Sequence, residues 1–216
     1  MTIKEQTAAS SGKYAGTSLQ DLPFVFCIGF NKCGTTTLHN FFRANGLPSI
    51  HNAGGRLAVR MLDNCMQARP IMAGMDDKYR CFSDMVWLND RIAVEGNWHF
   101  RLMDRDYPGS RFIYNTRSME SWLASKSKWV SPAGSYLERY KRILNTSSDA
   151  EVIEHWRSRR MLFEAEMFAY FKDRKDLLVL DIEKPGCPEA IAAFLGLELD
   201  PAHWAWLNKG LGASPA

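Results

Sequence analysis

Short apolar runs alternate with stretches of helical periodicity along most of the chain. Residues 24–28 form a continuous run of aromatic, β-branched and other apolar side chains, which predicts a strand buried on both faces. Residues 36–45 place Leu38, Phe41 and Phe42 at helical spacing, and a glycine and a proline just beyond them favour the end of a helix. The first predicted unit is therefore a strand, a loop and a helix.

The same signals recur along the chain and predict an alternating series of elements. A capping-box pattern from Ser148 to Glu151 opens the longest predicted helix, which ends near Asp173. The alternation of strands and helices, without internal repeats, predicts one α/β domain with a doubly wound, mostly parallel central sheet flanked by helices. The further predicted strands are residues 80–83, 111–116 and 177–181, and the further predicted helices are residues 57–65, 98–102, 118–123 and 188–195.

Length and composition fit this single-domain prediction. A chain of 216 residues with 46% hydrophobic residues can fill one α/β core, whereas two independent domains would be cramped. Residues 1–20 are rich in Ser, Ala, Thr and Gly and lack the apolar core of a signal peptide, so we expect a disordered tail followed by one domain over residues 21–216. No stretch approaches the roughly 18 consecutive apolar residues of a membrane span, so we expect none.

Charge and cysteine usage narrow the function classes. The formal net charge of +3 is too mild to favour nucleic acid as a partner, although it is compatible with a local basic pocket for a small polyanion. The chain has no C-x-x-C pair and no H-E-x-x-H motif, so we expect no metal. Scattered cysteines in an odd number indicate reduced thiols and a cytoplasmic location; they are Cys27, Cys33, Cys65, Cys81 and Cys187.

The loop after the first predicted strand carries the clearest chemical signal. It lies at the start of a helix, where unpaired backbone N–H groups and the aligned peptide dipoles form an anion site. The dipole contributes only about 0.3–1 kcal/mol, whereas each hydrogen bond to a charged group contributes about 1.5–3 kcal/mol, so Lys32 and the threonine hydroxyls should dominate. The candidate phosphate ligands are Asn31, Lys32, Cys33, Gly34, Thr35, Thr36 and Thr37, although Thr37 could instead face the sheet and Cys33 could be only a small tolerated side chain.

The position of the lysine distinguishes this loop from that of nucleotide triphosphatases. Those enzymes use G-x-x-x-x-G-K-[ST], with the lysine directly after the second glycine, and Thr35 occupies that position here. The lysine lies inside the loop instead, at Lys32. The sequence G-F-N-K-C-G-T-T-T-L resembles the 5′-phosphosulfate loop of sulfotransferases, whose usual form is K-x-G-T-T.

A second segment resembles the 3′-phosphate segment of the same family. There an arginine ends a strand and a serine follows eight residues later, as Arg117 and Ser125 do here, about two helical turns apart. Trp122, between them, is better explained as a core residue than as a surface on which adenine stacks. The resemblance extends to small bacterial sulfotransferases through residues 50–51, 83–85, 107–109 and 122–125, and covers most of the chain from Phe24 onward.

This resemblance implies a P-loop nucleotide-hydrolase-like fold, with 3′-phosphoadenosine 5′-phosphosulfate (PAPS) as co-substrate and adenosine 3′,5′-bisphosphate (PAP) as product. The implied reaction is an in-line displacement in which Lys32 neutralises charge on the leaving phosphate. Segment 208–210 also resembles basic Gly-containing C-terminal segments that fold over the nucleotide, and its Lys209 is a candidate ligand, although such a trio often ends a helix.

The sequence offers several candidates for the general base and for the acceptor. Sulfotransferases place a His or Glu near the acceptor, often just past the strand that precedes the 3′-phosphate segment, and Asp84 occupies that position, although an aspartate there can equally cap a turn. His51 and His99 are rival candidates, because an unperturbed imidazole titrates near neutral pH. We rank Asp84 first, His51 second and His99 third, since His99 lies in the predicted helix over residues 98–102. The acceptor can be a small molecule, a glycan, a lipid headgroup or a peptide, and the oligomeric state is open.

Two alternative functions remain at this stage. Residues 177–181 form an apolar strand that ends in Asp, as in P-loop kinases and nucleotide hydrolases, although the lysine such enzymes need after Gly34 is missing. The second alternative is a non-catalytic protein that binds PAPS or PAP without a working base.

Overall fold

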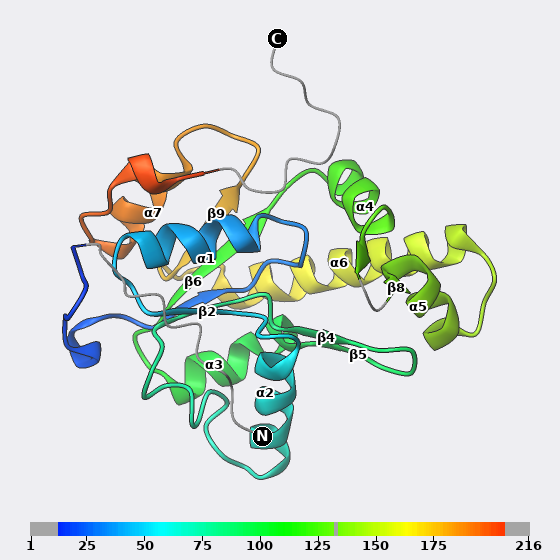
Figure 1. The fold of residues 1–216 in the computed structure, drawn as a ribbon, viewed down its shortest axis with the longest axis horizontal. Coiled ribbons are helices and arrows are strands. Elements are labelled where there is room, and N and C mark those ends of the chain that lie inside the picture. Colours follow the sequence, from blue (N-terminus) through cyan, green and yellow to red (C-terminus); the bar gives the residue numbers. More distant parts are fainter. Residues whose placement is uncertain (1–12, 132–133, 206–216) are drawn as a thin grey trace.

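Over the described residues, 13–131 and 134–205, the computed structural model has a central sheet of five parallel strands. In sheet order these are β2 (Ser49–His51), β3 (Cys81–Ser83), β1 (Val25–Cys27), β6 (Arg111–Thr116) and β9 (Leu177–Asp181). Val25 pairs with Cys81 on one side and with Arg111 on the other, so the chain crosses over in both directions from β1. The predicted α/β fold with a mostly parallel sheet is confirmed (Figure 1).

Helices cover both faces of this sheet. Helices α1 (Thr35–Ala44) and α7 (Cys187–Leu195) pack on one face, where Val25 and Cys27 meet their apolar side chains. Phe26 and Ile28 belong to the hydrophobic cluster on the opposite face. Successive side chains of a strand point to opposite faces, so a strand that is covered on both sides needs an apolar residue at every position.

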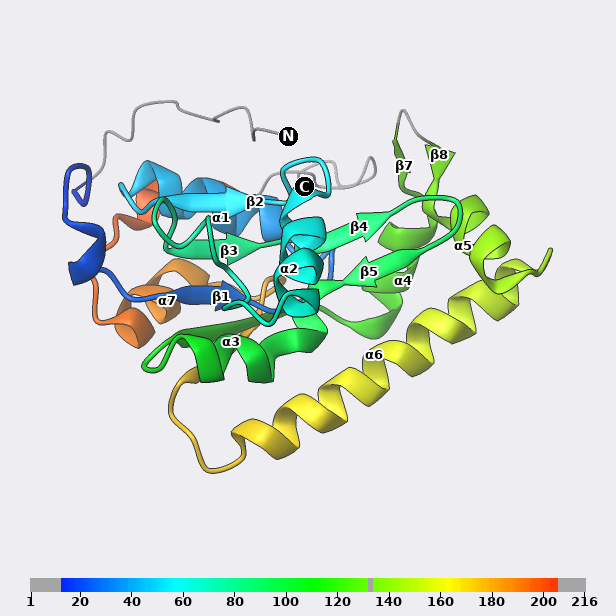
Figure 2. The same cartoon turned by 90° about the horizontal axis from the view of Figure 1, so that it is seen from below.

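Five helices contribute buried side chains to the cluster on the opposite face. The longest is α6, whose N-terminus is capped by the Ser148 hydroxyl, which accepts the Glu151 N–H at 3.3 Å as the capping box predicts. Figure 2 shows α6 (yellow) running past α3 toward α5. The five are α2 (Arg56–Met66), α3 (Phe100–Asp106), α4 (Met119–Ser127), α5 (Tyr136–Leu144) and α6 (Asp149–Phe171).

Several short elements were not predicted from the sequence. Strand β2 has three residues, and each strand of the hairpin formed by β4 (Val86–Leu88) and β5 (Ala93–Glu95) is equally short, so none shows a period-two pattern. Helix α5 and the strand pair β7 (Val130–Ser131) and β8 (Gly134–Ser135) were also missed. The predicted helix over residues 98–102 is divided, because the 3₁₀ turn η2 (Gly96–His99) ends where α3 begins.

The predicted disordered tail is too long at its C-terminal end. Residues 13–20 pack on the domain: the Tyr14 N–H donates to the Asn45 carbonyl at 3.3 Å, and the Tyr14 hydroxyl accepts the Glu198 N–H at 2.9 Å. Lys13 forms an ion pair with Glu198, and a 3₁₀ turn, η1 (Leu19–Asp21), leads into the sheet. The aromatic ring of Tyr14 packs against the hydrophobic cluster and holds this segment on the domain, although the composition of the segment is typical of a linker. Residues 1–12 lie outside the described part of the chain.

The chain after the last strand returns to α1 through the 3₁₀ turn η3 (Pro201–His203). Among the described helices, none combines the length and the apolar character that crossing a membrane requires.

Candidate active site

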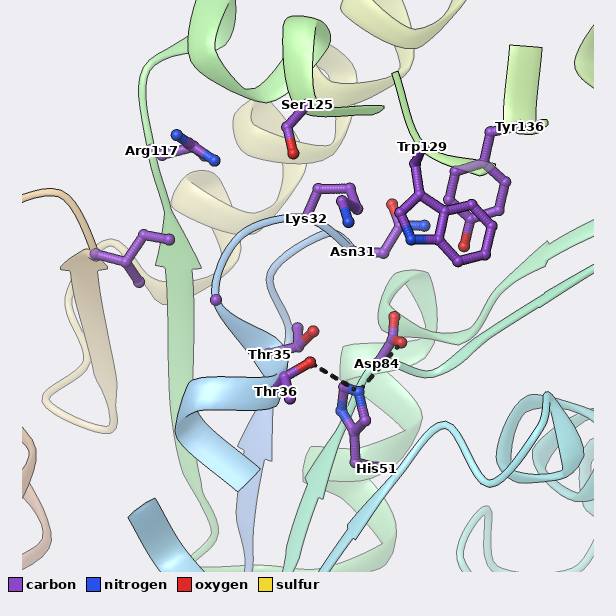
Figure 3. Close-up of a pocket in the computed structure, with 12 residues that line it drawn as sticks. Asn31, Lys32, Thr35, Thr36, His51, Asp84, Arg117, Ser125, Trp129 and Tyr136 are labelled. Atoms are coloured by element: carbon purple, nitrogen blue, oxygen red, sulfur yellow. Dashed lines mark hydrogen bonds and ion pairs between the residues drawn. The ribbon is translucent and has the colours of Figure 1, made fainter. Parts of the chain in front are cut away.

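A pocket opens where β1, β2, β3 and β6 end. Such a position follows from the parallel sheet, since the loops after neighbouring strands meet along one edge. The loop after β1 contributes Lys32, β2 ends at His51, Asp84 follows β3 and Arg117 follows β6 (Figure 3). Twelve residues line the pocket. Nine of them were predicted from the sequence and are Asn31, Lys32, Gly34, Thr35, Thr36, His51, Asp84, Arg117 and Ser125. The three that were not predicted are Trp129, Tyr136 and Ile182.

The loop after β1 adopts a conformation that few sequences allow. Gly34 has φ 74°, a conformation that favours glycine, and a Cβ atom there would lie 3.0 Å from Ile182 Cδ1, so the Ile182 side chain would have to shift to admit one. Lys32 also has a positive φ, 68°, which costs a non-glycine residue about 1–3 kcal/mol and is found where surrounding contacts hold the backbone in place. The Lys32 ammonium lies 5.6 Å from the centre of the Trp129 ring, inside the pocket.

Buried side chains behind the loop hold this conformation. Asn115 of β6 is fully buried; its Oδ1 accepts the Gly29 N–H at 3.1 Å and its Nδ2 donates to the Cys33 carbonyl at 2.7 Å. The Trp122 indole donates to the Asn31 carbonyl at 3.0 Å, so Trp122 is a core residue that supports the loop. The loop is therefore held from inside the protein by side chains that do not line the pocket.

Two of the predicted phosphate ligands do not present their side chains to the pocket. The side chains of Cys33 and Thr37 are buried and do not line it. Burial raises the pKa of the Cys33 thiol to about 12, so this thiol is protonated at neutral pH. Thr35 and Thr36, in the first turn of α1, do line the pocket. Lys209 lies outside the described residues, with the rest of segment 208–210.

Arg117 and Ser125 lie on the side of the pocket away from Asp84 (Figure 3). Arg117 forms an ion pair with Glu183, with Nη2 2.6 Å and Nε 3.1 Å from Oε1. Burial alone would raise the pKa of Glu183, but hydrogen bonds from Arg117 and from the Ser118 N–H outweigh it and hold the pKa below its usual value. The Arg117 backbone is held as well, since Arg160 Nη2 donates to its carbonyl at 2.8 Å.

Asp84 and His51 face each other across the opposite side of the pocket. Asp84 Oδ2 lies 3.6 Å from His51 Nε2, and the same nitrogen lies 3.4 Å from Thr36 Oγ1. The other ring nitrogen of His51 lies 3.1 Å from Ser83 Oγ, which fixes the orientation of the ring. The second carboxylate oxygen of Asp84, Oδ1, is buried and has no hydrogen-bond partner among the described residues.

Burial shifts the pKa values of Asp84, His51 and Lys32 in the direction that favours the neutral form of each side chain. It raises the pKa of Asp84, against the opposing charges of His51, Lys32 and Lys126. Burial also lowers the pKa of His51 and that of Lys32, and the Asp84 carboxylate opposes both shifts. Titratable groups with perturbed pKa values that share one pocket are typical of active sites. His99, the third candidate base, does not line the pocket.

Two aromatic side chains complete the wall beside Asp84. The rings of Trp129 and Tyr136 stack with centroids 4.2 Å apart and planes 25° from parallel. Burial raises the pKa of the Tyr136 hydroxyl. Sequence analysis missed both residues because no element was predicted after α4: Trp129 follows α4, and Tyr136 is the first residue of α5. The two aromatic residues on either side of a turn-forming stretch were the available signal.

The fold and the site together define a class of protein. An α/β sheet with a lysine-containing anion loop at a helix start, facing a second basic group, is typical of proteins that bind phosphorylated nucleotides. The described residues include no group of three or more His, Cys, Asp or Glu side chains that could hold a metal ion.

Comparison with known proteins gives the family. A family model described as a sulfotransferase domain matches residues 24–178, more than half of the chain, and the chain belongs to this family. The matched region contains every residue that lines the pocket except Ile182. A search of curated proteins returns no match.

Proposed function

We propose that this protein transfers the sulfuryl group of PAPS to a hydroxyl or amine of an acceptor by in-line displacement, with release of PAP. The observation that carries the proposal is that Lys32, at the start of α1, shares one pocket with Arg117 and Ser125 of the segment after β6. A nucleotide with an anionic group at both its 5′ and 3′ positions matches this arrangement, with one anion at Lys32 and the other at Arg117 and Ser125. Membership of the sulfotransferase family supports this choice of chemistry.

The pocket has two sides that suit a donor and an acceptor. Arg117 and Ser125 lie on one side, and Asp84 with the stacked pair Trp129 and Tyr136 lies on the other (Figure 3). In the proposed arrangement the nucleotide occupies the first side and the acceptor the second, with Lys32 between them. The acceptor is a small molecule, a glycan, a lipid headgroup or a peptide, and the reaction takes place in the cytoplasm.

Lys32 is proposed to stabilise the leaving group. When the bond between sulfur and the bridging phosphate oxygen breaks, negative charge develops on the 5′-phosphate, and a fixed ammonium in a partly buried site stabilises that charge. The positive φ of Lys32 supports this role, because the backbone is held in one conformation by Asn115 and Trp122 behind it. Thr35 and Thr36 can donate hydroxyl hydrogen bonds to the same phosphate.

Asp84 is proposed as the general base. As the acceptor oxygen bonds to sulfur, its proton passes to the Asp84 carboxylate, which lines the pocket. The raised pKa of Asp84 makes its carboxylate a stronger base than a solvent-exposed one, and His51 beside Oδ2 orients it. The arrangement keeps His51 as the second candidate, since its Nε2 faces the same space.

The kinase alternative has less support than the sequence alone offered. Asp181, the acid at the end of β9, does not line the pocket; its Oδ1 accepts the Glu183 N–H at 3.0 Å. The position after Gly34 is filled by Thr35, which cannot supply the charge of a lysine. Magnesium-dependent turnover of ATP by the purified protein would nonetheless favour a kinase or hydrolase and contradict the proposal.

The test is a transfer assay that follows PAP release from PAPS in the presence of acceptors representing phenols, sugars, lipid headgroups and peptides. Asp84→Asn should lower transfer by about 10²–10⁴-fold and leave PAP affinity unchanged. Asp90→Asn, which makes the same change at an exposed ion pair with Arg142, serves as the control and should keep full activity. An Asp84→Asn protein as active as the control would remove Asp84 from this role, and PAP binding without transfer to any acceptor would favour the non-catalytic alternative.

A further inference from the structure

Lys126 is a buried lysine that the proposed chemistry leaves unused. It follows Ser125 in α4, and only 2% of its side chain is exposed. Its ammonium lies 4.9 Å from the ring centres of both Trp122 and Trp156 and 5.4 Å from that of Tyr140. Lysine is almost never fully buried unless it is paired, and here aromatic faces provide most of the surroundings, through cation–π contacts.

The ion pair that Lys126 makes is a loose one. Its Nζ lies 3.6 Å from Glu95 Oε1, longer than the 2.7–2.9 Å typical of charge-assisted hydrogen bonds. The same carboxylate is shared with Tyr140, whose hydroxyl lies 3.5 Å away, and with Arg159 at 3.7 Å. Burial lowers the pKa of Lys126, and the Glu95 carboxylate opposes that shift. A buried, loosely paired charge is weak evidence for a stabilising role. The position of Lys126 in the fold is therefore its more informative feature.

Lys126 lies between the loop after β1 and the root of the β4–β5 hairpin. On the loop side, Trp122 donates to the Asn31 carbonyl, and the Phe30 ring centre is 6.0 Å from the ammonium. On the hairpin side, Glu95 pairs with Val86, two residues after Asp84, in the ladder between β4 and β5. The buried charge therefore connects the proposed donor loop with the segment that begins at Asp84.

We propose that Lys126 is a positioning residue whose enclosed positive charge keeps the Asp84 carboxylate ionised when the donor is bound. The inference rests on the proposed role of Asp84 as base. Lys32 can supply such a charge only in the free protein, because a bound phosphosulfate neutralises it. Lys126 is enclosed by aromatic rings and does not line the pocket, so a bound donor would not pair with it as it pairs with Lys32.

The other charges around both groups are compatible with this role. The pKa of Asp84 is raised by burial and lowered by the neighbouring cations, of which Lys126 is one. The titratable groups that interact electrostatically with Asp84 are His51, Lys32, Lys126 and Tyr136. Those that interact with Lys126 are Glu95, Cys33 and Asp84. Tyr140, Arg159 and His155 lie around Glu95.

The test is to titrate Asp84 directly, by carbon NMR of protein labelled at the aspartate carboxyls, with Asp84→Asn to assign its signal and PAP bound at saturation. In Lys126→Met the midpoint of Asp84 should move to higher pH than in the wild type. Lys128→Met removes an exposed lysine near the end of the same helix and should leave the midpoint in place. An Asp84 midpoint that is unchanged in Lys126→Met would overturn the proposal.

A second pair of variants covers the case in which Lys126→Met does not fold because Glu95 is left with less compensation. Glu95→Gln and the double variant Lys126→Met/Glu95→Gln differ only in the lysine, so the double variant should titrate Asp84 at higher pH than Glu95→Gln, and equal midpoints would contradict the role. In the transfer assay, Lys126→Met should lose on the order of tenfold in kcat/KM at the acid end of the profile and progressively less at higher pH.

The outcome is separable from that of the proposed function. PAP that binds no more tightly than adenosine 5′-phosphate would overturn the donor assignment, whereas an unchanged Asp84 titration would overturn only the role of Lys126.

Discussion

Asn115→Ala is the substitution that best tests how the donor loop is held. Asn115 is fully buried, and its amide side chain accepts the Gly29 N–H and donates to the Cys33 carbonyl, 3.1 and 2.7 Å away. Alanine removes both partners at once and leaves the two backbone groups buried. The loop between them contains Lys32, whose backbone conformation is unfavourable without support.

The magnitude follows from the two lost partners. A buried polar group left unsatisfied costs about 1–3 kcal/mol, so Asn115→Ala should lower the free energy of unfolding by about 2–6 kcal/mol. Typical domains have about 5–15 kcal/mol to lose, so most of the variant stays folded under mild conditions. Asn64→Ala is a matched control, because Asn64 is also buried and its Nδ2 donates to the Ile71 and Ala73 carbonyls, both at 3.0 Å, away from the pocket.

The assay combines urea unfolding with calorimetric binding of PAP. Both variants should lose stability, but only Asn115→Ala should bind PAP more weakly, by about tenfold or more, because its loop no longer presents a preformed anion site. The reasoning would be refuted by an Asn115→Ala protein that is destabilised like Asn64→Ala yet binds PAP as the wild type does.

Three further predictions address the charges of the site and its surroundings. Lys32→Ala should lower turnover in the PAP-release assay by about 10²–10³-fold, and near wild-type turnover would contradict its role. Glu183→Gln should tighten PAP binding by about two- to fivefold without changing the affinity for adenosine 5′-phosphate, because Arg117 loses a competing carboxylate; weaker binding would show that Glu183 chiefly positions Arg117. Burial, the neighbouring His51 and Arg43 lower the pKa of His39 from 6.5 to about 3, so between these values the unfolded chain binds a proton that the folded protein does not. The free energy of unfolding should therefore fall as the pH drops from about 6.5 toward 3, by up to about 1.4 kcal/mol per pH unit. Urea unfolding curves at about pH 5 and 7 should show a smaller pH dependence for His39→Gln than for the wild type, and an equal pH dependence would contradict the lowered pKa of His39.

The parts of the site that follow β1 and β6 could be predicted from the sequence. Lys32 and Arg117 each follow an apolar run that predicts a strand, and because the carboxyl ends of parallel strands meet along one edge, the two motifs line one pocket. The side chains of Cys33 and Thr37, four positions apart, are buried and do not line the pocket, which the loop motif alone does not reveal.

The remaining parts depend on packing that has no local signal. Trp129 and Tyr136 come together through the short pair β7 and β8, which is too short to show a periodic pattern. Lys126 reads as an exposed lysine in a polar helix, and only the packing of α4 with α5 and α6 buries it among aromatic rings. Tyr14 anchors its segment in the same way, by one contact that composition does not reveal.

The central claim is that the pocket recognises a nucleotide phosphorylated at both its 5′ and 3′ positions. Its most direct test is calorimetric binding of PAP compared with adenosine 5′-phosphate, which lacks the 3′-phosphate that Arg117 and Ser125 are proposed to contact. One hydrogen bond to a charged group contributes about 1.5–3 kcal/mol, so PAP should bind on the order of ten- to hundredfold more tightly. Equal affinities for the two nucleotides would contradict the account.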